Sequence, residues 1–340
     1  MRRLRFWTGK LTLPVWLTIT ALAAGGLGLL SRPCFLASAQ PQHARCLVYH
    51  HLVPERFLNP ARKLNGAILP AEDFAAHMQY LASHGYHVIT LTRFENMLDR
   101  KQAIPPRTVM ITFDDGYESV YRYAFPVLKK YRFPATVFLI TSLVGKSPPD
   151  PDPAAVTYLT WSQIRAMYQS GLVDFESHTH DMHRYLPGRP FPAPALVRSP
   201  PAQVLADLEA SRRAIFAHLG YLPTALAYPY GAYTAETARL AHQAGFRLGF
   251  ATRPGPSLPP DLQRYALPRV LVFPHTPWFA WRHFVLGEPL PIALLLFGPG
   301  KLPELGRILP GAGCSVDSVT SRRKEVRSRW IGRKKPRGSG

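Results

Sequence analysis

The sequence predicts an α/β protein built from parallel βα units, arranged either as a barrel or as an open sheet. Short apolar runs of strand length alternate along the chain with longer segments of helical periodicity, which is typical of both arrangements. The apolar run at residues 108–113 leads directly into a turn at Asp114, Asp115 and Gly116. A chain of 340 residues is long enough for one large domain with a full core, or for two smaller domains.

The predicted strands are short apolar runs bounded by turn residues. The run at residues 108–113 is the clearest, because it is apolar along its length and stops at two aspartates and a glycine. The other strands are predicted at residues 46–49, 87–91, 135–140, 173–176, 226–228, 248–251 and 266–271.

Segments with apolar residues at helical spacing lie between these strands. They predict helices at residues 71–83, 119–130, 161–169, 202–219 and 235–244. Residues 187–201 contain six prolines, which predicts a long surface loop without regular structure. Because this loop follows a cluster of histidines, we expect it at the rim of a functional site.

The N-terminal segment differs in composition from the middle of the chain. Residues 11–30 carry no charge and are numerous enough to cross a bilayer, and the basic residues before them predict that the N-terminus stays in the cytoplasm. Those basic residues are Arg2, Arg3, Arg5 and Lys10. Ala37 and Ala39 form the small-x-small pattern of a signal-peptidase site. Residues 1–40 are therefore interpreted as a signal peptide or a membrane anchor, and the rest as exported.

The C-terminal end is apolar at first and then strongly basic. Within residues 284–320, an apolar extension, the run 289–297 is too short to span a membrane. Residues 321–340 hold nine basic residues and the single acid Glu325, within a chain of net charge +20. This tail is predicted to be disordered and to attract an anionic envelope polymer or lipid, unless it only solubilises the protein. Nucleic acid is not expected as a partner, because no nucleic-acid-binding motif accompanies the charge.

Three histidines follow the predicted strand 173–176: His178, His180 and His183. Neutral imidazole is the commonest side-chain metal ligand, so this clustering favours a metal site. His183 joins His178 at one ion only if the turn between them is irregular, and His180 is the competing ligand. The three cysteines have no paired zinc spacing, which excludes a cysteine-based site.

One carboxylate and two imidazoles leave an open coordination position for water, as catalytic zinc sites require. Asp114 and Asp115 are the natural pair for the two carboxylate functions, one binding the metal and the other removing a proton. This combination suits hydrolysis of an ester or an amide.

Pro229, Tyr230 and Gly231 follow another predicted strand. Proline fixes one backbone angle and glycine permits the next turn, so the Tyr230 amide can face a pocket and donate to an oxyanion. A plain tight turn is the alternative interpretation of these three residues.

Taken together, these motifs resemble the polysaccharide deacetylases with a NodB homology domain, carbohydrate esterase family four. The matching residues are the 112–116 turn, His178-Thr179 with a following histidine, and 229–231, in the order of the family. The resemblance implies a distorted (β/α) barrel over residues 41–283. It further implies that Asp114 is the general base, that Asp115, His178 and His183 bind the metal, and that Tyr230 stabilises the oxyanion through its backbone.

Two departures from the family pattern narrow the resemblance. The outer histidines are spaced by five residues rather than four, and the arginine that the family places before Pro-Tyr-Gly is absent from residues 226–228. Both features are similar to the deacetylases of poly-β-1,6-N-acetylglucosamine in biofilm systems. The missing arginine predicts a less well oriented Asp114. His275, after the apolar residues 271–273, is the candidate general acid, with a surface-loop histidine as the alternative.

The expected function is metal-dependent N-deacetylation of an extracellular N-acetylglucosamine polysaccharide, with release of acetate. Zinc is the favoured ion, although an Asp-His-His set also accepts cobalt, nickel or iron. Deacetylation of peptidoglycan or chitin oligomers is the alternative within enzymes, and a non-catalytic glycan-binding protein is the alternative outside them. The adjacent Asp114 and Asp115 count against the latter, because a binding module needs no base.

Overall fold

The computed structural model describes residues 44–58, 68–147, 156–187, 193–252, 258–274 and 276–288, with only the backbone of Phe284. His275, the predicted leader at 1–40 and the basic tail at 321–340 lie outside these residues, as does nearly all of the apolar extension. No helix within the described ranges is long and apolar enough to cross a membrane.

Nine strands form the main sheet, and every pair within it is parallel. Their order is β12-β11-β10-β7-β6-β5-β1-β13, and β4 also pairs with β5. The strands are β1 (Arg45–Tyr49), β4 (His87–Val88), β5 (Thr108–Phe113), β6 (Ala135–Leu139), β7 (Val173–Ser177), β10 (Ala225–Ala227), β11 (Leu248–Ala251), β12 (Leu267–Pro268) and β13 (Val270–Leu271).

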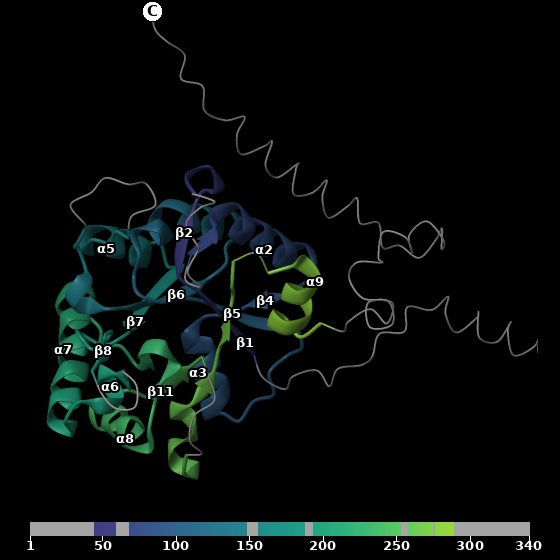
Figure 1. Cartoon of the computed structure of the whole chain (residues 1–340). Coiled ribbons are helices and arrows are strands. Elements are labelled where there is room, and N and C mark those ends of the chain that lie inside the picture. The colour runs from purple at the N-terminus through teal and green to yellow at the C-terminus, as the bar shows by residue number, and fades with distance from the viewer. Residues whose placement is uncertain are drawn as a thin grey trace, which may run out of the picture. The chain divides into compact units, whose positions relative to one another are not determined.

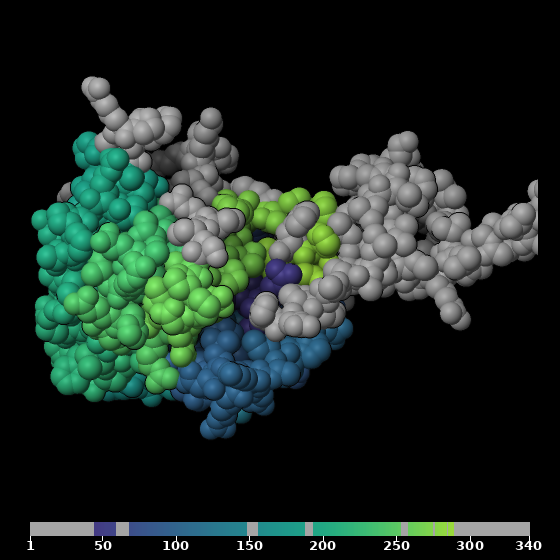
Figure 2. Space-filling view, turned by 90° about the horizontal axis from the view of Figure 1, so that it is seen from below, coloured from purple at the N-terminus to yellow at the C-terminus, as the bar shows by residue number. Residues whose placement is uncertain are grey.

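The two ends of this strand order are joined by one short stretch of chain. β12 pairs with β11, β13 pairs with β1, and only Arg269 separates β12 from β13. The stretch therefore brings the sheet nearly to closure, and the predicted distorted (β/α) barrel is confirmed. Figure 2 shows the purple start of the described chain beside the yellow-green segment that includes β13.

The helices lie outside the strands (Figure 1). They are α2 (Ala71–Ser83), α3 (Leu91–Asp99), α4 (Phe125–Tyr131), α5 (Trp161–Gln169), α6 (Ala195–Arg198), α7 (Pro201–Leu219), α8 (Ala235–Gln243) and α9 (Trp278–Ala280). Short 3-10 turns lie at η1 (Glu55–Phe57), η3 (Thr141–Leu143), η4 (Pro229–Gly231) and η5 (Pro260–Tyr265), and π-helical turns lie at η2 (Val120–Ala124) and η6 (Trp281–Val285).

Aromatic and aliphatic side chains fill the space between helices and strands. Phe74 of α2 is fully buried, with its ring 5.0 Å from that of Tyr49 in β1 and 5.5 Å from that of Phe113 in β5. Burying a side chain of this size stabilises the fold by about 1.5–3 kcal/mol. This packing anchors the ends of two strands, β1 and β5, from which functional residues emerge.

Most predicted elements are present, and the differences have local causes. The strand predicted at 87–91 ends at Val88, because the Thr90 side chain accepts a hydrogen bond from the Arg93 amide and starts α3. The helix predicted at 119–130 is a π-helical turn followed by α4, and Pro126 lies in the first turn of α4, where a missing N–H is tolerated.

The proline-rich loop predicted at 187–201 is wrong in its described part. There β9 (Ala193–Pro194) pairs antiparallel with β8 (Tyr185–Leu186), and α6 and the start of α7 follow. Pro194 ends its strand and Pro201 begins its helix, two positions at which proline loses no necessary hydrogen bond. The parallel pair β2 (His51–Val53) and β3 (Ile68–Pro70) was not predicted either.

Candidate active site

The residues singled out by the sequence follow the carboxyl ends of neighbouring strands. Asp114 and Asp115 follow β5, His178 follows β7, and Tyr230 lies in η4, just after β10. Because the strands are parallel, these ends lie at one edge of the barrel, where α/β folds bind ligands.

The turn after β5 sends the two aspartates in different directions. The Asp114 amide donates to the Tyr49 carbonyl at 3.0 Å and so continues the ladder between β5 and β1. Asp115 has φ 69°, a left-handed conformation that aspartate tolerates better than most residues. At Gly116 a Cβ would lie 2.8 Å from Leu139 Cδ2, so the tight turn requires glycine.

Asp115, His178 and His183 converge on one point. Asp115 Oδ1 lies 3.4 Å from His178 Nε2 and 3.3 Å from His183 Nε2. This oxygen is buried but accepts no hydrogen bond of acceptable geometry within the described residues. A tetrahedral ion with bonds of about 2.0–2.2 Å separates its ligand atoms by about 3.3–3.6 Å. The three residues therefore fit a divalent cation, and they are the one such group in the described chain.

The rings of His178 and His183 have surroundings that suit metal ligands. His178 is buried and its Nδ1 donates to the Ala227 carbonyl at 2.7 Å, which leaves Nε2 free to face Asp115. Burial, with the neighbouring His178, lowers the pKa of His183 to about 4, so its ring is neutral at neutral pH. Burial also acts to lower the pKa of His178, but Asp114 and Asp115 outweigh it and raise that pKa.

His180 does not reach this cluster. Its Nδ1 lies 2.9 Å from the Thr141 hydroxyl of η3, and its backbone amide donates to Asp207 of α7. The irregular turn that the sequence requires for pairing His178 with His183 is present, because Thr179 has φ 76°.

Asp114 is held by an arginine that the sequence reasoning missed. Arg269, between β12 and β13, donates from both terminal nitrogens to the two Asp114 oxygens at 2.7 Å, and both side chains are buried. Burial acts to raise the pKa of Asp114, but Arg269 and His178 outweigh it and lower that pKa, so the carboxylate stays ionised. The expectation of a poorly oriented Asp114 is wrong. A charged residue in the middle of the predicted strand 266–271 was the available signal.

Tyr230 lies beside the cluster in a strained turn. Its φ of 58° is left-handed, within a turn that also includes Gly231 at φ 68°. The Tyr230 ring lies between those of His183, at 4.4 Å, and Tyr185, at 4.3 Å. Because Tyr185 is 50% exposed, these three rings form a row from the cluster to the solvent, the aromatic row.

Two further residues of the site had no motif to reveal them. His50 follows β1, and its proximity helps His178 and His183 to lower the pKa of Asp115 far below its ordinary value, against the effect of burial. Burial and the neighbouring Asp115 raise the pKa of the Tyr117 hydroxyl, and the Tyr117 ring stacks at 5.4 Å on that of Tyr158. Of the sequence-predicted site residues, only His275 lies outside the described chain.

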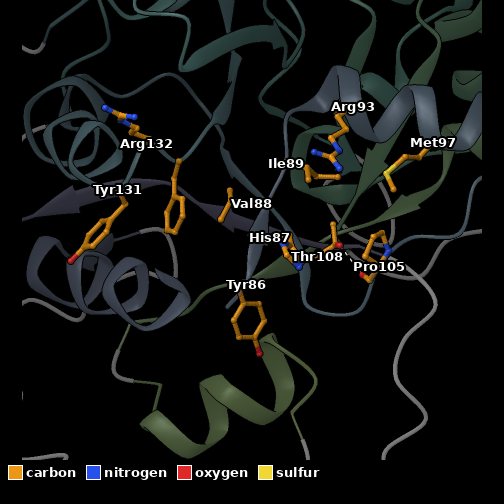
Figure 3. Close-up of a pocket in the computed structure, with 11 residues that line it drawn as sticks. Tyr86, His87, Val88, Ile89, Arg93, Met97, Pro105, Thr108, Tyr131 and Arg132 are labelled. Atoms are coloured by element: carbon orange, nitrogen blue, oxygen red, sulfur yellow. Dashed lines mark hydrogen bonds between the residues drawn. The ribbon is translucent and has the colours of Figure 1, made fainter. Parts of the chain in front are cut away.

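A separate cavity of about 360 Å³ lies at the other end of β5 (Figure 3). Its walls include Tyr86, Arg93 and Tyr131, together with Thr108, the first residue of β5. It shares no residue with the cluster around Asp115. The candidate catalytic residues therefore lie at the carboxyl edge of the barrel, and none of them lines this cavity.

Comparison with known proteins gives matches to one family. Residues 101–249 match the family model described as polysaccharide deacetylase. The chain is 33% identical over 215 residues to the poly-beta-1,6-N-acetyl-D-glucosamine N-deacetylase of Staphylococcus epidermidis, which covers 63% of this chain and 71% of the relative. It is 29% identical over 236 residues to the enzyme of that name from Staphylococcus aureus strain MRSA252, with 67% and 78% covered.

Solved structures agree with the sequence matches. A de-N-acetylase from Aggregatibacter actinomycetemcomitans superposes with a TM-score of 0.61 at 25% identity, covering 71% of this chain and 99% of the other. IcaB from Ammonifex degensii superposes with a TM-score of 0.58 at 29% identity, covering 68% and 93%.

Proposed function

This chain belongs to the polysaccharide deacetylase family, hydrolases of non-peptide carbon–nitrogen bonds, and we propose that it removes acetyl groups from an N-acetylglucosamine polysaccharide. The favoured substrate is poly-β-1,6-N-acetylglucosamine, which is the polymer in the names of the relatives from Staphylococcus. The observation that carries the proposal is the convergence of Asp115, His178 and His183 beside Asp114 and its Arg269 partner.

Asp115, His178 and His183 are proposed to hold the ion, with zinc favoured by the mixed oxygen and nitrogen donors. When bound, a divalent ion lowers the pKa of water and polarises a carbonyl oxygen. The Nε2 atoms of both imidazoles face Asp115, and the Nδ1 of His178 is held by the Ala227 carbonyl.

Asp114 is proposed to be the general base. Its carboxylate is buried and kept ionised by Arg269, and its Oδ2 lies 4.0 Å from His178 Nε2, next to the cluster but outside it. A water attacking the acetamide carbon loses a proton, and Asp114 is proposed to take it. The tetrahedral intermediate then carries negative charge on the former carbonyl oxygen, to which the Tyr230 amide is proposed to donate.

The departing nitrogen needs a proton before the C–N bond breaks, so that acetate and a free amine result. His50 is a candidate to supply it, because it follows β1 at the same edge of the barrel and influences both Asp114 and Asp115 electrostatically. We propose His50 as the general acid alongside the sequence-based candidate His275.

The aromatic row of His183, Tyr230 and Tyr185 provides a surface for the sugar. Aromatic faces pack well against the apolar face of a sugar ring, and Tyr185 is the exposed member of the row. A glycan that packs on Tyr185 would bring a neighbouring residue of the polymer to the cluster.

We propose that the enzyme acts outside the cytoplasmic membrane. The support is the basic and apolar character of residues 1–30, together with a substrate class that is extracellular. The basic residues 321–340 would then help retain it at an anionic envelope polymer or lipid.

The decisive experiment is acetate release from defined N-acetylglucosamine oligomers by the full-length protein. The expected result is release from β-1,6-linked oligomers that a chelator abolishes and added zinc restores. Preference for β-1,4-linked oligomers would instead favour chitin or peptidoglycan as the substrate. No release from either series, by protein shown to bind zinc, would reject the proposed activity.

A further inference from the structure

The loop between the two proposed histidine ligands is hydrogen bonded to helix α7. The His180 amide donates to Asp207 Oδ1 and the Asp181 amide to Asp207 Oδ2, both at 2.8 Å. One carboxylate thus binds two consecutive backbone amides midway between His178 and His183. In the described chain, no other charged side chain accepts hydrogen bonds from two amides of this loop. The Thr179 and Met182 amides donate to hydroxyl groups instead.

A second contact from α7 holds the beginning of the same loop. Ser211, one helical turn after Asp207, donates to the Leu208 carbonyl and bonds to Ser177 Oγ at 2.7 Å. Ser177 Oγ in turn accepts the Thr179 amide at 3.1 Å. Thr179 is fully buried with φ 76°, a conformation that a β-branched residue adopts only when its surroundings impose it.

On its other side the loop rests on η3. The Thr141 and Ser142 amides donate to the carbonyls of Thr179 and His180, at 3.2 and 3.0 Å. The Thr141 hydroxyl also bonds to the His180 ring. The loop is therefore fixed from two sides, but only α7 contributes a charged group, and charge-assisted hydrogen bonds are the stronger kind.

The geometry points to Asp207 as the positioning residue that sets the separation of His178 and His183. Because the histidines are five positions apart, no regular helix brings both rings to Asp115, so the backbone must bend at Thr179, directly before the amides that Asp207 binds. Without the carboxylate, two adjacent amides lose their acceptor and the bend at Thr179 loses support. This inference rests on the proposal that the cluster binds a divalent ion, and it adds a residue distant from that ion.

The test is the zinc affinity of the full-length protein, measured by competition with a chromophoric chelator. Asp207→Ala is expected to bind zinc about 10- to 100-fold more weakly than the parent, the range typical for loss of a partner behind a metal ligand. Glu209→Gln is the matched control, because Glu209 lies on the same helix but is paired with Arg213 at the surface. The control should bind zinc like the parent.

Asp207→Asn serves if the alanine variant does not fold. It keeps the side-chain volume and one acceptor, but turns an amide group toward the second N–H, so an intermediate loss of affinity is expected. Thermal unfolding with and without zinc separates positioning from stability. Zinc should raise the Tm of Asp207→Ala by less than it raises the Tm of the parent. This loss should be larger than the difference in Tm between the two metal-free proteins. Folded Asp207→Ala and Asp207→Asn that both bind zinc as tightly as the parent would overturn the inference. A parent protein that binds no zinc would instead reject the metal site itself.

Discussion

Arg269 and Asp114 form two parallel hydrogen bonds of 2.7 Å inside the barrel, although 155 residues separate them in the chain. The guanidinium also lies over the rings of Phe138, at 5.0 Å, and Phe250, at 6.0 Å. Planar, bidentate pairing fixes the orientation of a carboxylate as well as its charge. The base proposed for this enzyme is therefore oriented by the residue that links β12 to β13, where the sheet comes nearly to closure.

Replacing this arginine should impair turnover without removing the ion. Arg269→Lys keeps the charge but not the two-point geometry, so we expect kcat to fall by about 10-fold or more while zinc content is unchanged. Arg269→Met leaves a buried charge unpaired and should lower the free energy of unfolding by about 3–5 kcal/mol. Arg264→Lys, at a partly exposed ion pair with Asp99, is the control for both measurements. Full activity of Arg269→Lys would contradict this positioning role.

Asp114→Asn should separate metal binding from catalysis. The variant loses the base but none of the proposed ligands, so we expect zinc binding to be retained while acetate release falls by about 100-fold or more. Zinc content and acetate release are measured on the same preparation. Asp181→Asn, an exposed aspartate near the cluster, is the control. A zinc-loaded Asp114→Asn that keeps full activity would reject Asp114 as the base.

Single alanine variants of two histidines should give opposite results. His183→Ala removes a group 3.3 Å from Asp115 Oδ1, so its zinc affinity should fall by more than about 100-fold, beyond the usual cost of losing an outer partner. His180→Ala loses only the ring contact with Thr141 and should retain most of its zinc. Metal content after dialysis checks both. Loss of zinc from His180→Ala but not from His183→Ala would reverse the ligand assignment.

Tyr185→Ala should weaken binding of the polymer but not the chemistry. Loss of one exposed ring from the aromatic row is worth about 0.5–1.5 kcal/mol, or about a 2- to 12-fold increase in KM for a long oligomer. Hydrolysis of a small acetyl ester, which does not extend to Tyr185, should be unchanged. Tyr185→Phe should behave like the parent in both assays. An equal loss on both substrates would indicate damage to the cluster instead.

His77 should make the fold sensitive to acid. Burial lowers the pKa of His77 to about 3, and its ring stacks at 4.1 Å on Trp281. The unfolded chain takes up a proton below the ordinary pKa of 6.5 while the folded chain does not, so the free energy of unfolding falls as pH falls from about 6.5 toward 3.

The measurement is urea unfolding of the parent and of His77→Phe between pH 7 and pH 4.5. The phenylalanine variant lacks this titration, so its stability relative to the parent should rise by about 1 kcal/mol for each pH unit below about 6. A difference between the two proteins that does not change with pH would show that the pKa of His77 is the same in the folded and the unfolded chain.

The strands and the proposed reactive residues could be predicted because their signals are local. An apolar run followed by Asp114 and Asp115 indicates a strand end, and three histidines after the run at 173–176 indicate a metal site. The partnership of Arg269 with Asp114 has no local signal, because the two residues meet only once the sheet has nearly closed. The β8–β9 pair was missed because its prolines lie at positions where they cost no hydrogen bond.

The spacing of the histidines alone also could not show whether His180 or His183 joins His178 as a metal ligand. That choice depends on the left-handed Thr179, which is imposed by Ser177 and by contacts from α7 and η3 rather than by its own preference. His50 is a similar case. It follows the first strand, and only the pairing of that strand with β5 brings it to the same edge of the sheet as Asp114 and Asp115.

The position of Arg269 in the chain has a consequence for the order in which the protein becomes active. A ribosome or an export channel delivers the N-terminal part first, so Asp114, Asp115, His178 and His183 are all available before Arg269 emerges. Until then the sheet lacks its last two strands, and the Asp114 carboxylate lacks its two hydrogen bonds from the guanidinium. The proposed base therefore gains its orienting partner only after nearly the whole described chain has been delivered.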